Sequence, residues 1–119
     1  MKFNNEKPIY IQIADILISR VLSGDFLPEA KIPSIRETAV QLEVNPNTAA
    51  RAFTFLQDQD IIYNRRGMGF FVSPDGKQRA LKLKREDFIK EQIPNLKQNM
   101  NLLSISQKEL LELLQEDDK

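Results

Sequence analysis

The chain has 119 residues, of which 41% are hydrophobic, and its 17 basic and 17 acidic side chains give a net charge of zero. This length predicts one compact domain with at most a small appendage. The chain has neither cysteine nor histidine, which excludes disulfides, thiolate zinc sites and cysteine nucleophiles and removes the usual neutral-pH general base. We therefore expect no enzyme, no cofactor and no metal site. The balanced charge gives no overall support for nucleic-acid binding, so such support has to come from where the charges lie.

The first seven residues are polar and lack the apolar core of a signal peptide. No stretch of the chain approaches the length of a membrane span. These features predict a cytoplasmic protein without a membrane partner.

The first predicted element is a helix that begins at Pro8 and ends at Gly24. Proline suits a first helical turn because its missing N–H would be unpaired there, and glycine accepts the left-handed conformation that stops a helix. The apolar residues that recur at helical spacing between them are Ile9, Ile13, Ile16, Leu17 and Val21. We expect these five side chains to form the buried face.

Two short helices joined by a tight turn are predicted next. Ser34 and Glu37 have the spacing of a capping box, in which each residue's side chain bonds to the other's backbone amide. Asn45 and Pro46 suit the cap and first residue of a second helix, which we expect to run to about Gln57. This arrangement is typical of a helix-turn-helix motif. The predicted inner stripe of the second helix is Ala49, Ala52, Phe53 and Leu56.

A β-hairpin is predicted after the helix pair. Residues 61–63 and 70–72 are β-prone, and the segment between them is basic and rich in glycine. A hairpin tip of this kind can reach the DNA backbone or the adjacent minor groove.

The predicted second helix of the pair has an outer face suited to DNA. Such a helix can lie in the major groove and present its first residues to base edges. No acidic residue occurs between Val44 and Gln57, so no carboxylate would face the phosphates. Helix N-termini also favour anions, which includes the start of the first helix of the pair. The candidate DNA-binding residues on these features are Ser34, Arg36, Asn47, Thr48, Arg51, Arg65 and Arg66.

Each of these features also has an ordinary structural explanation. An arginine on a helix is usually a solvated charge, a capping box is common helix chemistry, and two arginines in a hairpin often only improve solubility. The order of the features within one short domain favours the DNA-binding interpretation.

The same residues resemble a GntR-type winged-helix regulator over residues 8–73. The resemblance rests on Pro8-Ile9-Tyr10, Gln12-Ile13, Gly24, Pro28, Ile32-Pro33-Ser34-Ile35-Arg36-Glu37, Val44-Asn45-Pro46-Asn47-Thr48, Arg51-Ala52-Phe53, Leu56 and Gly67-Met68-Gly69-Phe70-Phe71-Val72. It implies DNA contacts at Ser34, Arg36, Asn47, Thr48 and Arg51, and at the wing tip, Gly67 and Gly69. Three positions depart from the family pattern: Glu29 and Asp60 replace glycines, and Phe70 replaces a small or hydroxyl residue, which we expect to change how the wing lies on DNA.

The remaining residues, 77–119, are predicted to be helices only, after a turn at residues 73–76. An a/d seam with spacings of 4, 3, 4 and 3 runs along the first of them, and Pro94 either kinks this helix or restarts it. Ser106 and Glu109 form a second capping box. The candidate dimer-interface residues are Ile89, Ile93, Leu96, Met100, Leu103, Leu110 and Leu114. These side chains pack either on the winged domain of the same chain or on a second copy, and we favour the second copy because so short a helix pair buries little alone.

Taken together, the sequence predicts a mostly α, α+β protein with a winged helix-turn-helix domain at residues 1–76 and a two-helix dimerisation tail at residues 77–119. The short tail resembles the YtrA-like branch. The expected function is that of a homodimeric transcription regulator that binds a two-fold symmetric double-stranded DNA operator. We favour a repressor over an activator. The alternative is a winged-helix protein-interaction module without DNA binding, which would explain the zero net charge. No small-molecule effector is indicated.

Overall fold

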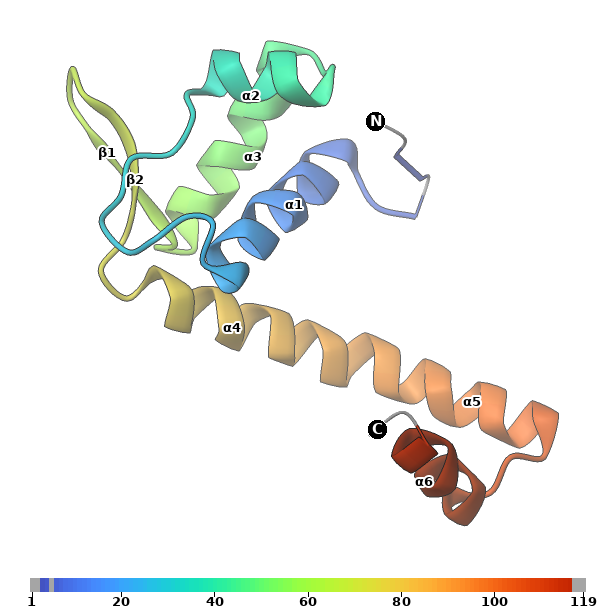
Figure 1. Cartoon of the computed structure of the whole chain (residues 1–119). Helices are drawn as coiled ribbons and strands as arrows, with labels where there is room; N and C mark the ends of the chain where they lie inside the picture. The colour runs from blue at the N-terminus through green and yellow to red at the C-terminus, as the bar shows by residue number, and fades with distance from the viewer. Residues whose placement is uncertain (1–2, 5, 117–119) are drawn as a thin grey trace. The chain divides into compact units, whose positions relative to one another are not determined.

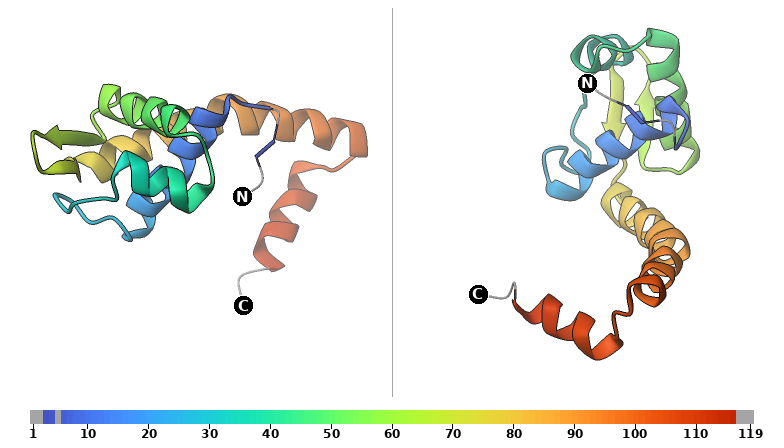
Figure 2. Two further views of the ribbon diagram at one scale, coloured as in Figure 1. Left: turned by 90° about the horizontal axis from the view of Figure 1, so that it is seen from above. Right: turned by 90° about the vertical axis from the view of Figure 1, so that its right-hand side faces the viewer.

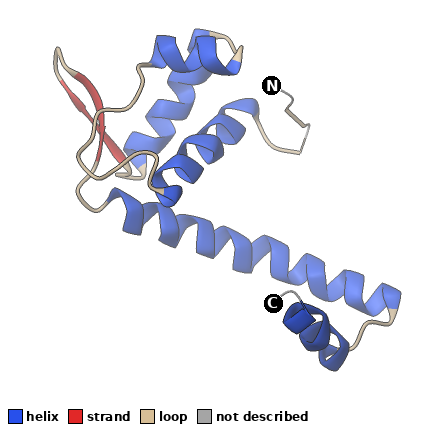
Figure 3. Ribbon diagram, in the orientation of Figure 1, coloured by secondary structure: helices blue, strands red, loops and turns tan. Residues whose placement is uncertain are grey.

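The computed structural model describes residues 3–4 and 6–116 (Figure 1). The chain divides into two compact units, Met1–Lys82 and Leu83–Lys119, which are treated separately below. The fold is mostly helical with one small sheet, as predicted, and Figure 3 shows that both strands belong to the first unit. Within the described residues no helix is long and apolar enough to cross a membrane.

The first unit contains three helices, a hairpin and the first turns of a fourth helix. These elements are α1 (Ile9–Ser23), α2 (Ile35–Leu42), α3 (Pro46–Asp58), β1 (Ile62–Arg65), β2 (Gly69–Val72) and the start of α4 (Gly76–Asp87). Helices α1 and α2 both pack against α3, and α3 also contacts β1.

The first helix begins at Ile9, one residue after the predicted start, with Pro8 as its N-cap. It ends at Gly24, whose φ of 91° is left-handed, as the sequence predicts. Its buried face differs from the prediction. Ile13, Leu17 and Val21 are buried, but so are Ala14 and Ile18, whereas Ile9 is 46% exposed and Ile16 only half-buried. The side of α1 that faces the core is therefore centred between Leu17 and Ile18, and Ile9 and Ile16 lie beyond its edge.

Local chemistry fixes the ends of α2 and α3. The Ser34 amide donates to Glu37 Oε1 and the Glu37 amide donates to Ser34 Oγ, both at 3.0 Å, which confirms the capping box. Asn45 Oδ1 accepts from the Asn47 amide at 2.8 Å and caps α3, which begins at Pro46. The predicted inner stripe, Ala49, Ala52, Phe53 and Leu56, is buried.

The hairpin pairs Ile62 with Val72 and Arg65 with Gly69. Strand β1 continues to Arg65, two residues closer to the tip than predicted. The turn closes only there, because the Met68 amide donates to the Arg65 carbonyl at 2.8 Å. Gly67 and Gly69 have φ values of 76° and 110°, which residues with a side chain rarely adopt. Lys31 forms an isolated antiparallel bridge with Phe71 and so lies along the free edge of β2.

Helix α4 starts at the turn where the sequence places the end of the winged domain. Its first turns belong to the first unit, in which Ala80 is fully buried and Gly76 lies against Ile61. A Cβ at Gly76 would stand 2.6 Å from the Ile61 carbonyl oxygen, so this close approach requires glycine.

The second unit contains the end of α4, a π-helical turn η1 (Phe88–Gln92), α5 (Ile93–Leu103) and α6 (Gln107–Glu116). Helical residues continue without a break past Pro94, which lies in the first turn of α5. The Ile93 amide donates to the Phe88 carbonyl, five residues back, as in a π-helix. Pro94 has no N–H to donate, and this wider turn lets the helix continue past it. A turn ending at Ser104, whose φ of 57° is left-handed, leads to α6 (Figure 2).

Candidate nucleic-acid interface

The first turn of α3, helix α2 and the hairpin tip lie towards the same end of the first unit in Figures 1 and 2. This end therefore carries the three features that the sequence assigned to DNA. On α3, Asn47 and Arg51 are exposed and Thr48 is half-buried. At the tip, Arg65 and Arg66 are both exposed.

Arg51 is held against another helix. Its guanidinium carbon lies 4.3 Å from the ring centroid of Tyr10, in the first turn of α1. The sequence did not indicate this contact, since the two residues are far apart in the chain. Tyr10 is therefore a candidate site residue that sequence reasoning missed.

The wing holds its two arginines differently. The Arg65 guanidinium carbon lies 5.1 Å from the Phe71 ring centroid, over a ring that itself stacks on Tyr63. Arg66 is part of the turn closed by the Met68 amide. Arg65 thus contacts an aromatic face, and Arg66 is exposed at the tip.

Lys31 is a second residue that sequence reasoning missed. Its Cε would lie 3.1 Å from a Cβ at Gly69, so the lysine side chain lies against the wing at the space that this glycine leaves. Lys31 also contributes, as the weakest of the favourable influences, to lowering the pKa of Glu37. The positive charge of the wing therefore comes from Lys31, Arg65 and Arg66 together. The place of Lys31 beside the wing depends on the pairing of residue 31 with the edge of β2, which the sequence does not indicate.

Ser34 and Arg36 lie at the N-terminus of α2. The Ser34 amide donates to the Glu37 carboxylate, and Ser34 Oγ accepts from the Glu37 amide. The pKa of the Glu37 carboxyl lies below its ordinary value, first because of the bond from the Ser34 amide and then because of the Ser34 hydroxyl beside the carboxyl. The Glu37 carboxylate thus already occupies the position at which an anion would meet this helix end. Arg36 is exposed beside it.

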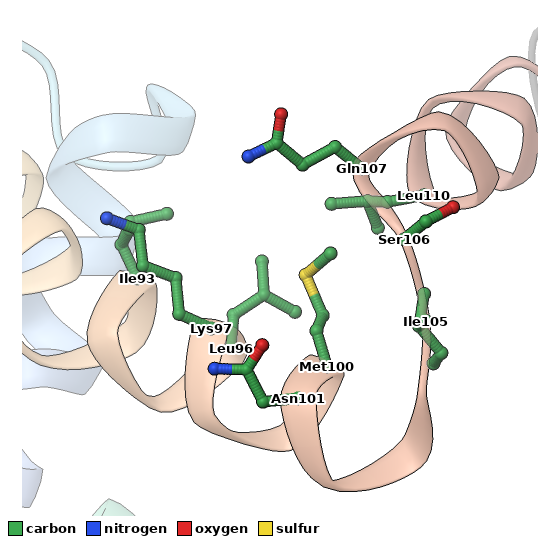
Figure 4. A pocket seen from close by; sticks show the side chains of 9 residues that line it. All are labelled: Ile93, Leu96, Lys97, Met100, Asn101, Ile105, Ser106, Gln107 and Leu110. Carbon is green, nitrogen blue, oxygen red and sulfur yellow. The ribbon is translucent and has the colours of Figure 1, made fainter.

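The predicted tail residues fall into two groups. Ile93, Leu96, Met100 and Leu110 line one groove of about 630 Å³ between α5 and α6, together with Lys97, Asn101, Ile105, Ser106 and Gln107 (Figure 4). Ile89 lies outside this groove, in a separate hollow with Lys84, Arg85 and Phe88, because the π turn offsets it from α5. Leu103 and Leu114 are 69% and 59% exposed.

Within the described residues no group of three or more histidine, cysteine, aspartate or glutamate side chains is placed to hold a metal ion. Apart from the Glu37 carboxylate that caps α2, the candidate interface residues carry amide, hydroxyl and cationic side chains. These groups can bind phosphates and base edges.

Comparison with known proteins adds family information. The family described as bacterial regulatory proteins, gntR family, matches residues 9–72. The HTH-type transcriptional regulator YhcF of Bacillus subtilis is 34% identical over 111 residues, which is 93% of this chain and 90% of YhcF. The HTH-type transcriptional repressor YtrA of the same organism is 37% identical over 89 residues, which is 75% of this chain and 68% of YtrA.

Solved structures agree with these matches. A GntR family transcriptional regulator from Listeria monocytogenes has a TM-score of 0.78 at 33% identity, covering 96% of this chain and 98% of its own. The DNA-binding domain of AraR, solved in complex with operator ORR3, has a TM-score of 0.56 at 30% identity and covers 61% of this chain and 88% of its own.

Proposed function

Because the chain belongs to the gntR family of bacterial regulatory proteins, within its YtrA-like branch, we propose that it is a homodimeric repressor that binds a two-fold symmetric operator. Membership of this family makes the chain a DNA-binding transcription regulator and not an enzyme. The expected cytoplasmic location is part of the proposal, since the DNA partner lies there.

The observation that carries the proposal is the character of α3. Its outward side chains near the N-terminus are polar or cationic, and no carboxylate occurs on the helix before Asp58. A helix of this kind enters the major groove with its first turns towards the bases. We assign base-edge contacts to Asn47, Thr48 and Arg51, since amide and guanidinium groups pair with adenine and guanine.

Phosphate contacts are assigned to the other cations at the same end of the unit. Arg65 and Arg66 are exposed on the wing, Lys31 lies against Gly69 at its edge, and Arg36 is exposed in the first turn of α2. Contacts to phosphate position the protein without reading sequence. A protein with zero net charge can thus bind DNA through one cationic face, so the balanced composition does not favour the protein-interaction alternative.

Dimerisation is proposed from the second unit. Leu103, Leu111 and Leu114 are all more than half exposed, although large apolar side chains gain free energy by leaving water. A second copy would cover these leucines and the groove between α5 and α6. Two protomers would place two recognition helices on successive major grooves, which matches a palindromic operator.

Repression is the simpler mode of action, because occupancy of a promoter suffices. Among the relatives, YtrA carries the name repressor.

The DNA-binding step is tested by enriching duplexes from a randomised pool with the parent protein and measuring affinity by mobility shift. We expect Arg51→Ala to weaken binding by roughly 1–3 kcal/mol. Arg20→Ala, in the last turn of α1, is the control and should leave binding unchanged. Failure of the parent protein to enrich any duplex would contradict the proposal.

A further inference from the structure

Tyr10 and Arg51 form a pair between the first turn of α1 and the outer face of α3. The Arg51 guanidinium carbon is 4.3 Å from the Tyr10 ring centroid, well inside the range of a cation–π interaction. The two side chains line one shallow hollow with Thr54, Phe55 and Asp58. Tyr10 is half-buried, whereas Arg51 is exposed.

The pair determines where the Arg51 charge is held. Among the described residues no carboxylate forms an ion pair with Arg51, so the aromatic ring is the group that restrains its end. An unrestrained arginine loses rotamer freedom when it binds, and this loss weakens the complex. When a guanidinium stacks on an aromatic face, its N–H donors point outward in its own plane and stay available for a base edge or a phosphate.

We propose that Tyr10 is a positioning residue for DNA recognition, which holds the Arg51 guanidinium in place before the operator arrives. The proposal rests on the proposed function, since it assigns to α1 a role in the same DNA contact. It differs from a purely structural role because the important property of Tyr10 is its aromatic face. It also differs from a direct DNA contact because Tyr10 acts only through Arg51.

The test uses Tyr10→Phe, which keeps the ring, and Tyr10→Leu and Tyr10→Met, which keep apolar bulk without it. The probe is the duplex enriched by the parent protein, and thermal unfolding is measured for every variant. We expect Tyr10→Phe to bind as the parent does, and the leucine and methionine variants to bind roughly two- to five-fold more weakly. In an Arg51→Ala background the Tyr10→Leu change should have no further effect.

A measurement without DNA tests the pair itself. The side-chain protons of Arg51 should be shifted upfield in the NMR spectrum by the ring current in the parent and Tyr10→Phe proteins, and this shift should vanish in Tyr10→Leu. Unchanged affinity of both ring-less variants, an equal loss in the Arg51→Ala background, or no upfield shift in the parent would overturn the inference. A parent protein that enriches no duplex would instead overturn the proposed function, and the positioning role with it.

Discussion

The Phe70 ring in β2 packs edge-on against the Phe53 ring in α3, with ring centroids 4.9 Å apart and ring planes at 71°. Phe53 is part of the core, and Phe70 is half-buried above it. This pair joins the hairpin to the recognition helix. The expectation that Phe70 changes how the wing lies on DNA stays a prediction, and the observed contact ties the wing to α3.

Phe70→Leu should therefore lower the free energy of unfolding by about 1 kcal/mol, since aromatic pairs of this geometry contribute about 0.5–1.5 kcal/mol beyond their buried area. The measurement is urea unfolding. Met68→Leu, at the exposed wing tip, is the matched control and should change stability by less than about 0.5 kcal/mol. Equal stability of Phe70→Leu and the parent would show that the ring contact contributes nothing.

Glu29 stands at a position where the family pattern has glycine, and its φ is 64°. Left-handed backbone costs a residue with a side chain roughly 1–2 kcal/mol, while glycine adds entropy to the unfolded chain. We expect Glu29→Gly to raise the free energy of unfolding by about 0.5–1 kcal/mol. Glu29→Ala keeps the strain and should give no gain, and a similar gain in both variants would point to the loss of the charge instead.

The capping box of α2 should respond to acid. The Ser34 amide and then the Ser34 hydroxyl lower the pKa of Glu37 below its ordinary 4.5. A carboxyl whose pKa is lower in the folded state contributes stability above the unfolded pKa and loses it as the pH falls through the folded pKa. The stability difference between the parent and Glu37→Gln should thus be full above pH 4.5 and shrink below it.

Urea unfolding of both proteins at a series of pH values measures this difference. Ser34→Ala serves as the second variant, since it removes the hydroxyl partner and should cost about 1 kcal/mol at neutral pH. A gap between the parent and Glu37→Gln that stays constant into acid would contradict the assignment.

The wing arginines should control the salt dependence of operator binding. Each phosphate contact releases counterions, so affinity falls linearly with salt on logarithmic axes. Arg65→Ala and Arg66→Ala should each reduce the slope by about one unit if each side chain meets one phosphate. Arg20→Ala is the control, because this residue lies in the last turn of α1, where its guanidinium lies over the Phe26 ring. Slopes identical to the parent would remove both arginines from the interface.

The parts of the fold set by local chemistry could be predicted from the sequence. The Ser34–Glu37 capping box, the Asn45 cap and the glycine-rich hairpin tip each depend on residues within a few positions of one another. Features that depend on tertiary packing could not be predicted in the same way. The buried side of α1 is set by α3, and the Tyr10–Arg51 pair joins residues that are neighbours only in the folded unit.

The tail shows a third case, in which a regular a/d repeat describes only part of the helix. The sequence gives Ile89 a place on the same seam as Ile93 and Leu96, but the π turn before Pro94 adds an offset that a regular repeat does not contain. The remaining seam residues divide between a groove inside the tail and its outer surface. This division decides which variants can test dimerisation.

Leu96 and Met100 are poor positions for such a test. Both line the groove against Leu110 of α6, so a charge at either would disturb the packing of the tail within one chain. Leu103 and Leu114 are largely exposed in a single chain, and a charge there would be buried without a partner only in a dimer. Leu103→Glu combined with Leu114→Glu therefore separates the interface from the fold.

We expect this double variant to sediment as a monomer and to keep the thermal unfolding of the first unit, whose core of Leu17, Phe53 and Leu56 it does not touch. Its affinity for a palindromic duplex should fall to that for a half-site, because one protomer supplies one recognition helix. Lys108→Glu, at the exposed start of α6, is the charge-matched control and should stay dimeric. A double variant that remains dimeric would show that these leucines lie outside the interface, and a monomer that binds the palindrome as tightly as the parent would show that dimerisation is not needed for operator binding.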